Sequence, residues 1–147
     1  WKQGTAPPGW SYWQSGASKG HPNWDRTVGR TAPGSGALVG MKNGCLIQSV
    51  SVTPGERWAV AAWCRVQGAG TPSFAMRWQT PEGKWHAEAL DVSLSAVRTE
   101  GEWTLRAGAG VVPDGAGKLV LLPSVTGQQS DQDTIWWDDV VAFRMED

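Results

Sequence analysis

Short stretches in which apolar and polar residues alternate run along the whole chain, and helical periodicity is nearly absent. Alternation at every residue is typical of a β-strand with one buried face. Gly- and Pro-containing segments separate the stretches, as expected for turns. We expect strands at residues 9–14, 36–40, 45–52, 57–66, 73–79, 85–92, 102–106, 118–125 and 133–144. The pattern predicts an all-β, two-sheet antiparallel β-sandwich.

Two segments lack clear alternation. Residues 15–35 read as a long loop that carries Trp24, and loops of this length are often functional. Residues 93–100 read either as a loop or as a turn of helix. There is no internal repeat or linker, and 147 residues is an ordinary length for one domain, so we expect a single domain over residues 1–147.

The segment 45–66 predicts which side chains face the core. Its central TPGE favours a turn between two paired strands. Placing Val50 and Val52 on the apolar face assigns the second strand: Trp58, Val60, Ala62 and Cys64 point inward, and Ala59, Ala61, Trp63 and Arg65 point outward. An outward Trp beside an Arg, with small alanines leaving room above the sheet, is typical of a binding site.

The following strands repeat this polar outer face. Phe74, Met76 and Trp78 form the apolar side of segment 73–79, and Trp85 begins the next segment. If these strands are neighbours, one polar, aromatic surface contains Trp63, Arg65, Arg77, Gln79, His86 and Glu88. The alternative is an ordinary solvated sheet face.

Tryptophan dominates the aromatic content, with 11 Trp against 2 Phe and 1 Tyr. An indole is a large flat surface that stacks on a sugar ring or anchors a protein partner. A core of unusually large residues accounts for about half of them. We assign Trp58, Trp78, Trp103 and Trp137 to the core, and Trp24, Trp85 and Trp136 join Trp63 as ligand candidates.

Charge and hydropathy exclude several partners. The 13 basic and 14 acidic residues are spread along the chain, which gives a net charge of −1 and no basic patch for nucleic acid or anionic lipid. No apolar run reaches the roughly 20 residues of a membrane span. The N-terminus has no signal-peptide pattern, so we expect a mature module or a piece of a longer protein.

Catalytic motifs are absent from the sequence. The glycine-rich segments 34–40 and 108–117 lack phosphate-binding spacing, and His21 and His86 stand in no metal-ligand or nucleophile motif. Asp138 and Asp139 are adjacent on a predicted strand and so face opposite sides, unlike a glycosidase pair, which faces one substrate across about 5–9 Å. We therefore expect no enzyme.

Cys45 and Cys64 allow two interpretations. One register of the expected hairpin places them opposite each other, and the register that keeps the apolar residues together would need a β-bulge for a disulfide. Both alternatives stay open, and in either case we expect small, mostly buried side chains.

Four motifs lie in a recognisable order: GWSYW (9–13), LIQSVSVTPGERWAVAAWCR (46–65), GEWTLRAGAGVVPDGAGKLVLLPSV (101–125) and TIWWDDVVAFR (134–144). Together they resemble the non-catalytic carbohydrate-binding modules of the galactose-binding-like jelly-roll superfamily, especially those appended to xylanases and glucanases. The resemblance covers nearly the whole chain and implies a jelly-roll sandwich. It also implies a secreted module, covalently linked to other domains, that binds glycan in a concave sheet groove or in loops at one end.

The resemblance further implies a structural calcium, held partly by the first Asp of the closing motif, here Asp138, and by a glutamate near the N-terminus. Lys2 stands at the matching N-terminal position. Either calcium is bound near Asp138, or the Lys2 ammonium neutralises that carboxylate in place of the ion.

These observations predict non-catalytic binding of a polysaccharide or oligosaccharide by a monomeric module, with Trp63 as the platform and Arg65, Arg77, Gln79, His86 and Glu88 around it. The alternative is a structural or protein-interaction module of a larger extracellular or phage-like assembly. A polysaccharide lyase would need a catalytic tyrosine cluster, and Tyr12 is the single tyrosine.

The closing strand predicts a division between its two tryptophans. Ile135 and Trp137 share the apolar face, which leaves Trp136 outward. The family pattern continues that face with Val140 and Ala142, and this requires a kink at Asp138–Asp139; without a bulge, Val141 and Phe143 would continue it.

Overall fold

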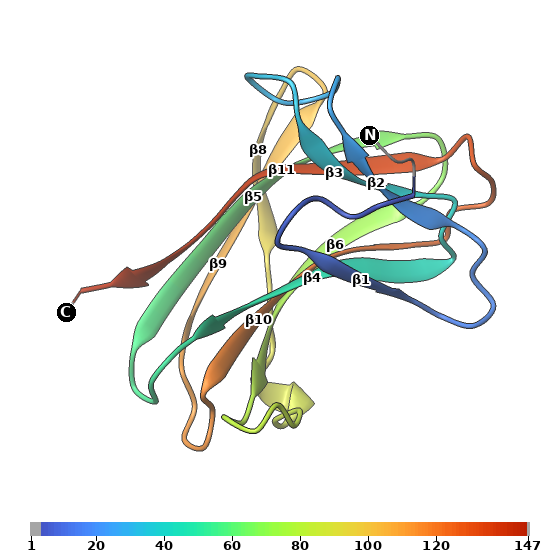
Figure 1. The fold of residues 1–147 in the computed structure, drawn as a ribbon. Helices are drawn as coiled ribbons and strands as arrows, with labels where there is room; N and C mark the ends of the chain where they lie inside the picture. Colours follow the sequence, from blue (N-terminus) through green and yellow to red (C-terminus); the bar gives the residue numbers. More distant parts are fainter. Residues whose placement is uncertain (1–3, 147) are drawn as a thin grey trace.

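The structure, a computed structural model, describes residues 4–146, which form two antiparallel β-sheets packed against each other (Figure 1). In spatial order, the five-stranded sheet contains β1 (Ser11–Gln14), β4 (Asn43–Ser51), β10 (Lys118–Thr126), β6 (Thr71–Gln79) and β7 (Val92–Ser93). The six-stranded sheet contains β2 (His21–Asp25), β3 (Ser35–Val39), β11 (Thr134–Met145), β5 (Arg57–Gln67), β9 (Trp103–Val111) and β8 (Ser95–Glu100). The predicted two-sheet antiparallel sandwich is confirmed.

The core lies between the two sheets and is built from alternate residues of their central strands. β6 contributes Phe74, Met76 and Trp78, and β5 contributes Val60, Ala62 and Cys64. β10 adds Leu119, Leu121 and Val125, and β11 adds Ile135 and Trp137. The rings of Phe74 and Trp137 meet edge to face, with centroids 5.4 Å apart. The inward facings predicted for β5, β6 and β11 are therefore confirmed.

The hairpin expected over residues 45–66 is wrong. β4 belongs to the five-stranded sheet and β5 to the six-stranded sheet, so the TPGE turn carries the chain from one sheet to the other. Its backbone bonds to the β9–β10 connection: Val112 N–H donates to the Glu56 carbonyl and Val52 N–H to the Gly117 carbonyl. A Pro-Gly turn fits both arrangements, because alternation fixes the facing of each strand and not its partner.

Three segment assignments also differ from the sequence-based ones. Residues 15–35 contain β2, whose sequence HPNWD is poor in β-forming residues and lies at a sheet edge, where proline is tolerated. In 85–92, Trp85 makes one isolated bridge to Gln79, and Glu88–Leu90 form a 3₁₀ turn, η1. In 93–100, Ser93 ends β7, and residues 95–100 form β8, which pairs with β9. In the described range no helix is long and apolar enough to cross a bilayer.

A β-bulge divides β11 into two halves. The pairing of β11 with β5 shifts between Asp138 and Val141, and Asp139 takes a positive φ of 49°. Val140 and Ala142 consequently pack on the core, whereas Val141 and Phe143 are about half exposed on the outer side. The kink at Asp138–Asp139 is confirmed, and the interpretation without a bulge is wrong.

A second apolar cluster covers part of the outer face of the six-stranded sheet. It contains Ala37, Val39, Trp63, Trp103 and Trp136. The Arg30 guanidinium lies 4.3 Å from the centre of the Trp63 ring, and Arg65 lies 4.9 Å from that of Trp136. We call this group the arginine-capped cluster. Trp103 is buried, as expected, but in this cluster and not in the main core.

Cys45 and Cys64 are both buried free thiols. Cys64 packs in the core, and Cys45 packs with Val120 and Leu122 on the outer side of the five-stranded sheet. Burial raises the pKa of each thiol above its ordinary value. The expectation of small buried side chains is confirmed, and no disulfide joins them.

The fold makes a first prediction at Gln128, whose side chain is 2% exposed. Its amide oxygen accepts from Met41 N–H (2.8 Å) and its amide nitrogen donates to the Leu38 carbonyl (3.0 Å). Gln128→Ala leaves both buried backbone groups unpaired, so we expect the free energy of unfolding to fall by about 2 kcal/mol or more in urea denaturation. The neighbouring Gln129→Ala, on an exposed side chain, should change it by less than about 0.5 kcal/mol. Equal effects would contradict this role.

A second prediction concerns Asp25, which accepts hydrogen bonds from the Trp136 indole (2.9 Å) and from the N–H groups of Thr27 and Val28. Burial alone raises the pKa of this carboxyl, but the hydrogen bonds outweigh burial and lower it below its ordinary value. A lowered folded-state pKa adds stability that is present above the unfolded-state value of about 3.9 and is lost as pH falls through the folded-state value.

Urea unfolding followed from about pH 7 to about pH 2.5 should therefore show stability falling at the acid end, and Asp25→Asn should weaken that fall. An identical pH dependence in the variant and the parent would show that Asp25 is not the titrating group.

Candidate functional site

The residues expected to form one ligand surface lie in separate places. Trp63, Arg65 and Trp136 lie on the outer side of the six-stranded sheet. Arg77, Gln79, Trp85, His86 and Glu88 belong to β6 and the segment after it, at the five-stranded sheet. Trp24 borders a pocket between the sheets. The expectation of one continuous surface is wrong, because β5 and β6 are in different sheets.

The arginine-capped cluster offers no open aromatic platform. Trp63 and Trp136 face outward as predicted, but they are only 6% and 7% exposed. Arg30 and Arg98 both lie over the Trp63 ring, and Arg65 is held over Trp136 while it pairs with Glu102 at 3.1 Å. A sugar could stack on these rings only if the arginines moved away.

The outer side of the five-stranded sheet, which we call the five-strand face, is built differently. Its floor is apolar and contains Cys45, Ile47, Ala75, Val120 and Leu122. Trp13 lies opposite Cys45 at one end, and Trp85 lies opposite Gln79 at the other. Each of these two tryptophans is 50% exposed.

The length of the five-strand face follows from its register. Ser73 is in the cross-strand row of Trp13, and Gln79 is in the row of Trp85. The two rows are six positions apart along β6, about 20 Å along the strand. The two indoles thus mark the ends of a surface long enough for several sugar rings.

Polar side chains are held in place on the five-strand face. The Arg77 guanidinium lies 4.1 Å from the centre of the Trp85 ring, donates to Asp91 (2.8 Å) and lies 3.6 Å from Glu88. Gln79 and Lys118 occupy the same cross-strand row as Trp85. Hydroxyl groups border the apolar floor, from Ser11, Ser49, Ser51, Ser73, Ser93 and Ser124.

Both ring nitrogens of His86 form hydrogen bonds with the backbone. Its Nε2–H donates to the Asp114 carbonyl at 2.8 Å, and its Nδ1 accepts from Ala87 N–H at 2.9 Å. A ring with its hydrogen on Nε2 satisfies both bonds. His86 therefore ties the segment after β6 to the β9–β10 connection instead of facing a ligand.

Sequence reasoning missed Trp13. Alternation in SYWQ shows that Tyr12 and Trp13 face opposite sides, but it does not show which side is the outer one. The structure answers this through the pairing of Trp13 with Cys45, which places the indole on the five-strand face.

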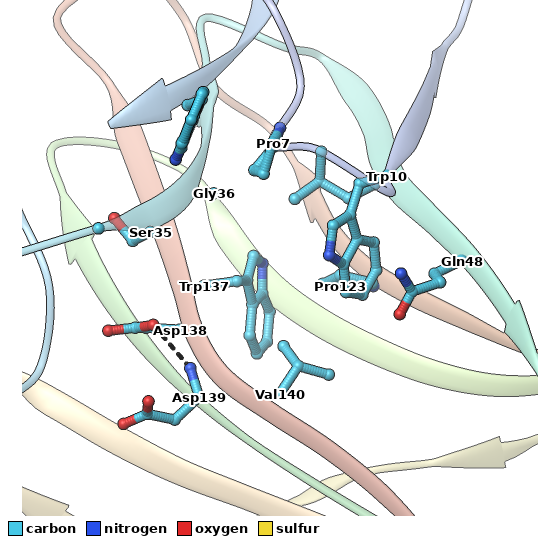
Figure 2. A pocket seen from close by; sticks show the side chains of 13 residues that line it. Pro7, Trp10, Ser35, Gly36, Gln48, Pro123, Trp137, Asp138, Asp139 and Val140 are labelled. Atoms are coloured by element: carbon cyan, nitrogen blue, oxygen red, sulfur yellow. Dashed lines mark hydrogen bonds between the residues drawn. The ribbon is translucent and has the colours of Figure 1, made fainter. Parts of the chain in front are cut away.

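A pocket with a volume of about 300 Å³ lies between the sheets (Figure 2). Its walls are Pro7, Trp10, Trp24, Gly34, Ser35, Gly36, Leu46, Gln48, Pro123, Trp137, Asp138, Asp139 and Val140. Trp24 thus has a place in a hollow on the inner side of the six-stranded sheet, whereas Trp136, whose indole bonds to the adjacent Asp25, faces the outer side. No sequence pattern indicated the pocket, because its walls come from distant segments.

The carboxylate of Asp138 is already occupied by backbone donors. Arg30 N–H donates to Oδ2 and Asp139 N–H to Oδ1, both at 2.8 Å. Within residues 4–146, no group of three or more His, Cys, Asp or Glu side chains is placed to hold a metal ion. Lys2 lies outside the described residues, so the choice between calcium and Lys2 stays a prediction.

Comparison with known proteins gives structural matches only. No protein-family model and no curated protein sequence matches the chain. Among solved structures, the enzymatically active domain of bacteriophage CBA120 tailspike protein 4 matches with a TM-score of 0.72 at 16% identity, over 94% of this chain and 20% of that chain.

Two other matches are structures of carbohydrate-binding modules in complex with glycans. A Clostridium thermocellum xylanase structure with a family 22 module, complexed with xylohexaose, matches with a TM-score of 0.67 at 14% identity, over 95% of this chain and 26% of that chain. A family 61 module in complex with β-1,4-galactotriose matches with a TM-score of 0.60 at 17% identity, over 97% and 92% of the two chains.

At these identities the likeness is one of fold. The resemblance found in the sequence is confirmed at that level: the chain has the two-sheet β-sandwich fold of the matched carbohydrate-binding modules.

Proposed function

We propose that the protein is a non-catalytic glycan-binding module that holds a polysaccharide or oligosaccharide chain along the five-strand face. The observation that carries this proposal is the pair of half-exposed indoles, Trp13 and Trp85, at the two ends of an apolar floor. Pyranose rings have apolar faces that stack on indoles, so a chain of several sugars can contact both ends at once.

The polar groups of the five-strand face fit this ligand. Sugar hydroxyls both donate and accept hydrogen bonds, and Gln79, Lys118 and the bordering serines supply both kinds of partner. Arg77 is fixed by Asp91 and Glu88, so it presents a preorganised cation beneath Trp85. Preorganisation lowers the entropic cost of binding.

The same ion pairs argue against catalysis on this face. A glycosidase presents one protonated and one ionised carboxyl group to the scissile bond. Asp91 and Glu88 instead contact the same guanidinium, an arrangement suited to two ionised carboxylates with a structural role. A binding role is the simpler assignment.

The matched xylanase structure supports a modular context, because its family 22 module shares a chain with a GH10 module. We place this chain likewise in a secreted, glycan-active protein. A second candidate is a structural module of a phage-like assembly; the tailspike match supports only the phage context, because the matched domain is itself enzymatically active. The two candidates differ in whether the isolated chain binds glycan.

The test is a fluorescence and calorimetric titration with soluble xylan, mixed-linkage β-glucan and β-1,4-galactan. We expect at least one of these polymers to bind. Trp13→Ala and Trp85→Ala should each lower the affinity by about 2 kcal/mol, roughly thirtyfold, since each removes a stacking surface.

Phe143→Ala is the matched control, because Phe143 is 52% exposed but lies on the outer side of the six-stranded sheet. It should leave the affinity unchanged. Binding that depends on Phe143 and is indifferent to Trp13 and Trp85 would place the site on the other sheet. Absence of binding to any polymer would favour the structural candidate.

A further inference from the structure

The pocket between the sheets is a second place with the features of a ligand site. It lies on the inner side of the five-stranded sheet, bordered by Leu46 and Gln48 of β4, whereas the five-strand face is the outer side of the same sheet. Its volume of about 300 Å³ falls at the small end of the range for small-molecule sites, about 300–1,000 Å³. A site here would take a small group instead of a polymer.

The pocket is bordered by an unpaired hydrogen-bond donor, the indole N–H of Trp137. Trp137 is 2% exposed, and its Nε1 has no partner among the described residues. The comparable indoles are paired: Trp78 Nε1 donates to the Leu90 carbonyl and Trp136 Nε1 to Asp25, each at 2.9 Å. Because buried indole donors are normally paired, Trp137 lacks an acceptor that this pocket has room to supply.

The Trp137 ring is held rigidly in this position. Phe74 packs edge-on against it, with an interplanar angle of 81°. Figure 2 shows the rings of Trp10 and Trp137 on opposite sides of the hollow, with Asp138, Asp139 and Val140 along its lower border. The two rings thus provide flat apolar walls, and the Trp137 ring also carries the unpaired donor.

The remaining walls offer an acceptor. The Gln48 amide nitrogen donates to the Gly9 carbonyl at 3.0 Å, so the amide oxygen of Gln48 is the group that can accept a hydrogen bond from a ligand. Asp138 and Asp139 border the pocket, but both Asp138 oxygens already accept backbone N–H groups and Asp139 Oδ2 pairs with Arg30 at 2.9 Å. The pocket therefore combines one donor, the Gln48 acceptor and, with two carboxylates to one guanidinium, an excess of negative charge nearby.

We propose that this pocket binds one neutral pyranose unit, such as the terminal residue of a glycan, as a site separate from the five-strand face. A ring oxygen or hydroxyl accepts from Trp137 Nε1, another hydroxyl donates to the Gln48 amide oxygen, and the apolar ring face lies against Trp10. An anionic sugar is disfavoured by Asp138 and Asp139.

The experiment follows the indole ¹H–¹⁵N resonances of ¹⁵N-tryptophan-labelled protein during titration with methyl galactoside, methyl glucoside and methyl xyloside at millimolar concentrations. The Trp137 resonance is identified by its loss in Trp137→Phe. We expect that resonance to shift saturably with at least one neutral glycoside, and galacturonic acid to bind more weakly than galactose.

Trp137→Phe keeps an aromatic ring near Phe74 and removes the indole donor together with part of the ring, so it should weaken the glycoside affinity about three- to tenfold. Trp78→Phe is the matched control: Trp78 is also buried, but it does not border the pocket. It should leave the glycoside affinity unchanged. Affinity in both variants is read from the shift of the Trp10 resonance.

Three results would overturn the proposal. The first is that no neutral glycoside shifts the Trp137 resonance saturably. The second is that added free indole shifts this resonance while no glycoside does, which would indicate a purely apolar pocket. The third is that Trp137→Phe and Trp78→Phe have the same glycoside affinity. Failure here is distinguishable from failure of the five-strand face, because Trp13 and Trp85 give their own resonances in the same spectra.

Discussion

The bulge in β11 is the constraint on which the rest of the structure depends. β11 pairs with both β3 and β5, so a change of facing within it changes what both sides of the six-stranded sheet present. Asp139 takes the left-handed φ of 49°, a conformation that Asp tolerates better than most residues. Before the bulge Trp137 packs inward and Trp136 outward; after it, Val140 and Ala142 pack inward.

The bulge also anchors the loop before β3. Asp138 Oδ2 accepts from Arg30 N–H, and Arg30 then pairs with Asp139 and covers the Trp63 ring. One distortion of the closing strand therefore seals the arginine-capped cluster. A tryptophan on the outer side of a sheet is not by itself a binding platform, because the chain can supply its own cation to cover it.

This explains how much the sequence could reveal. Alternation correctly predicted the facings in β5, β6 and β11, including the split between Trp136 and Trp137, because facing is a local property of a strand. It could not predict that β4 and β5 lie in different sheets, since the TPGE turn fits either arrangement. That error merged Trp63 and Arg65 with Arg77 and Gln79 into one surface. It also hid Trp13, whose outward position depends on its pairing with β4.

The outer sides of the two sheets and the pocket differ in whether their tryptophan rings are covered and whether the indole N–H has an acceptor. In the arginine-capped cluster, Trp136 has a hydrogen-bond acceptor in Asp25 and an arginine over its ring. On the five-strand face, Arg77 also lies against the Trp85 ring, at 4.1 Å, yet Trp13 and Trp85 are each 50% exposed to solvent. Trp137 is buried, yet within residues 4–146 its indole N–H has no acceptor, and Gly36, opposite it on β3, has no side chain with which to supply one. A Cβ at position 36 would come within 2.7 Å of Leu46, so glycine is required where β3 approaches Leu46 at the border of the pocket. The same glycine thus accounts for the close approach of β3 to Leu46 and for the lack of a side-chain acceptor opposite Trp137 on β3.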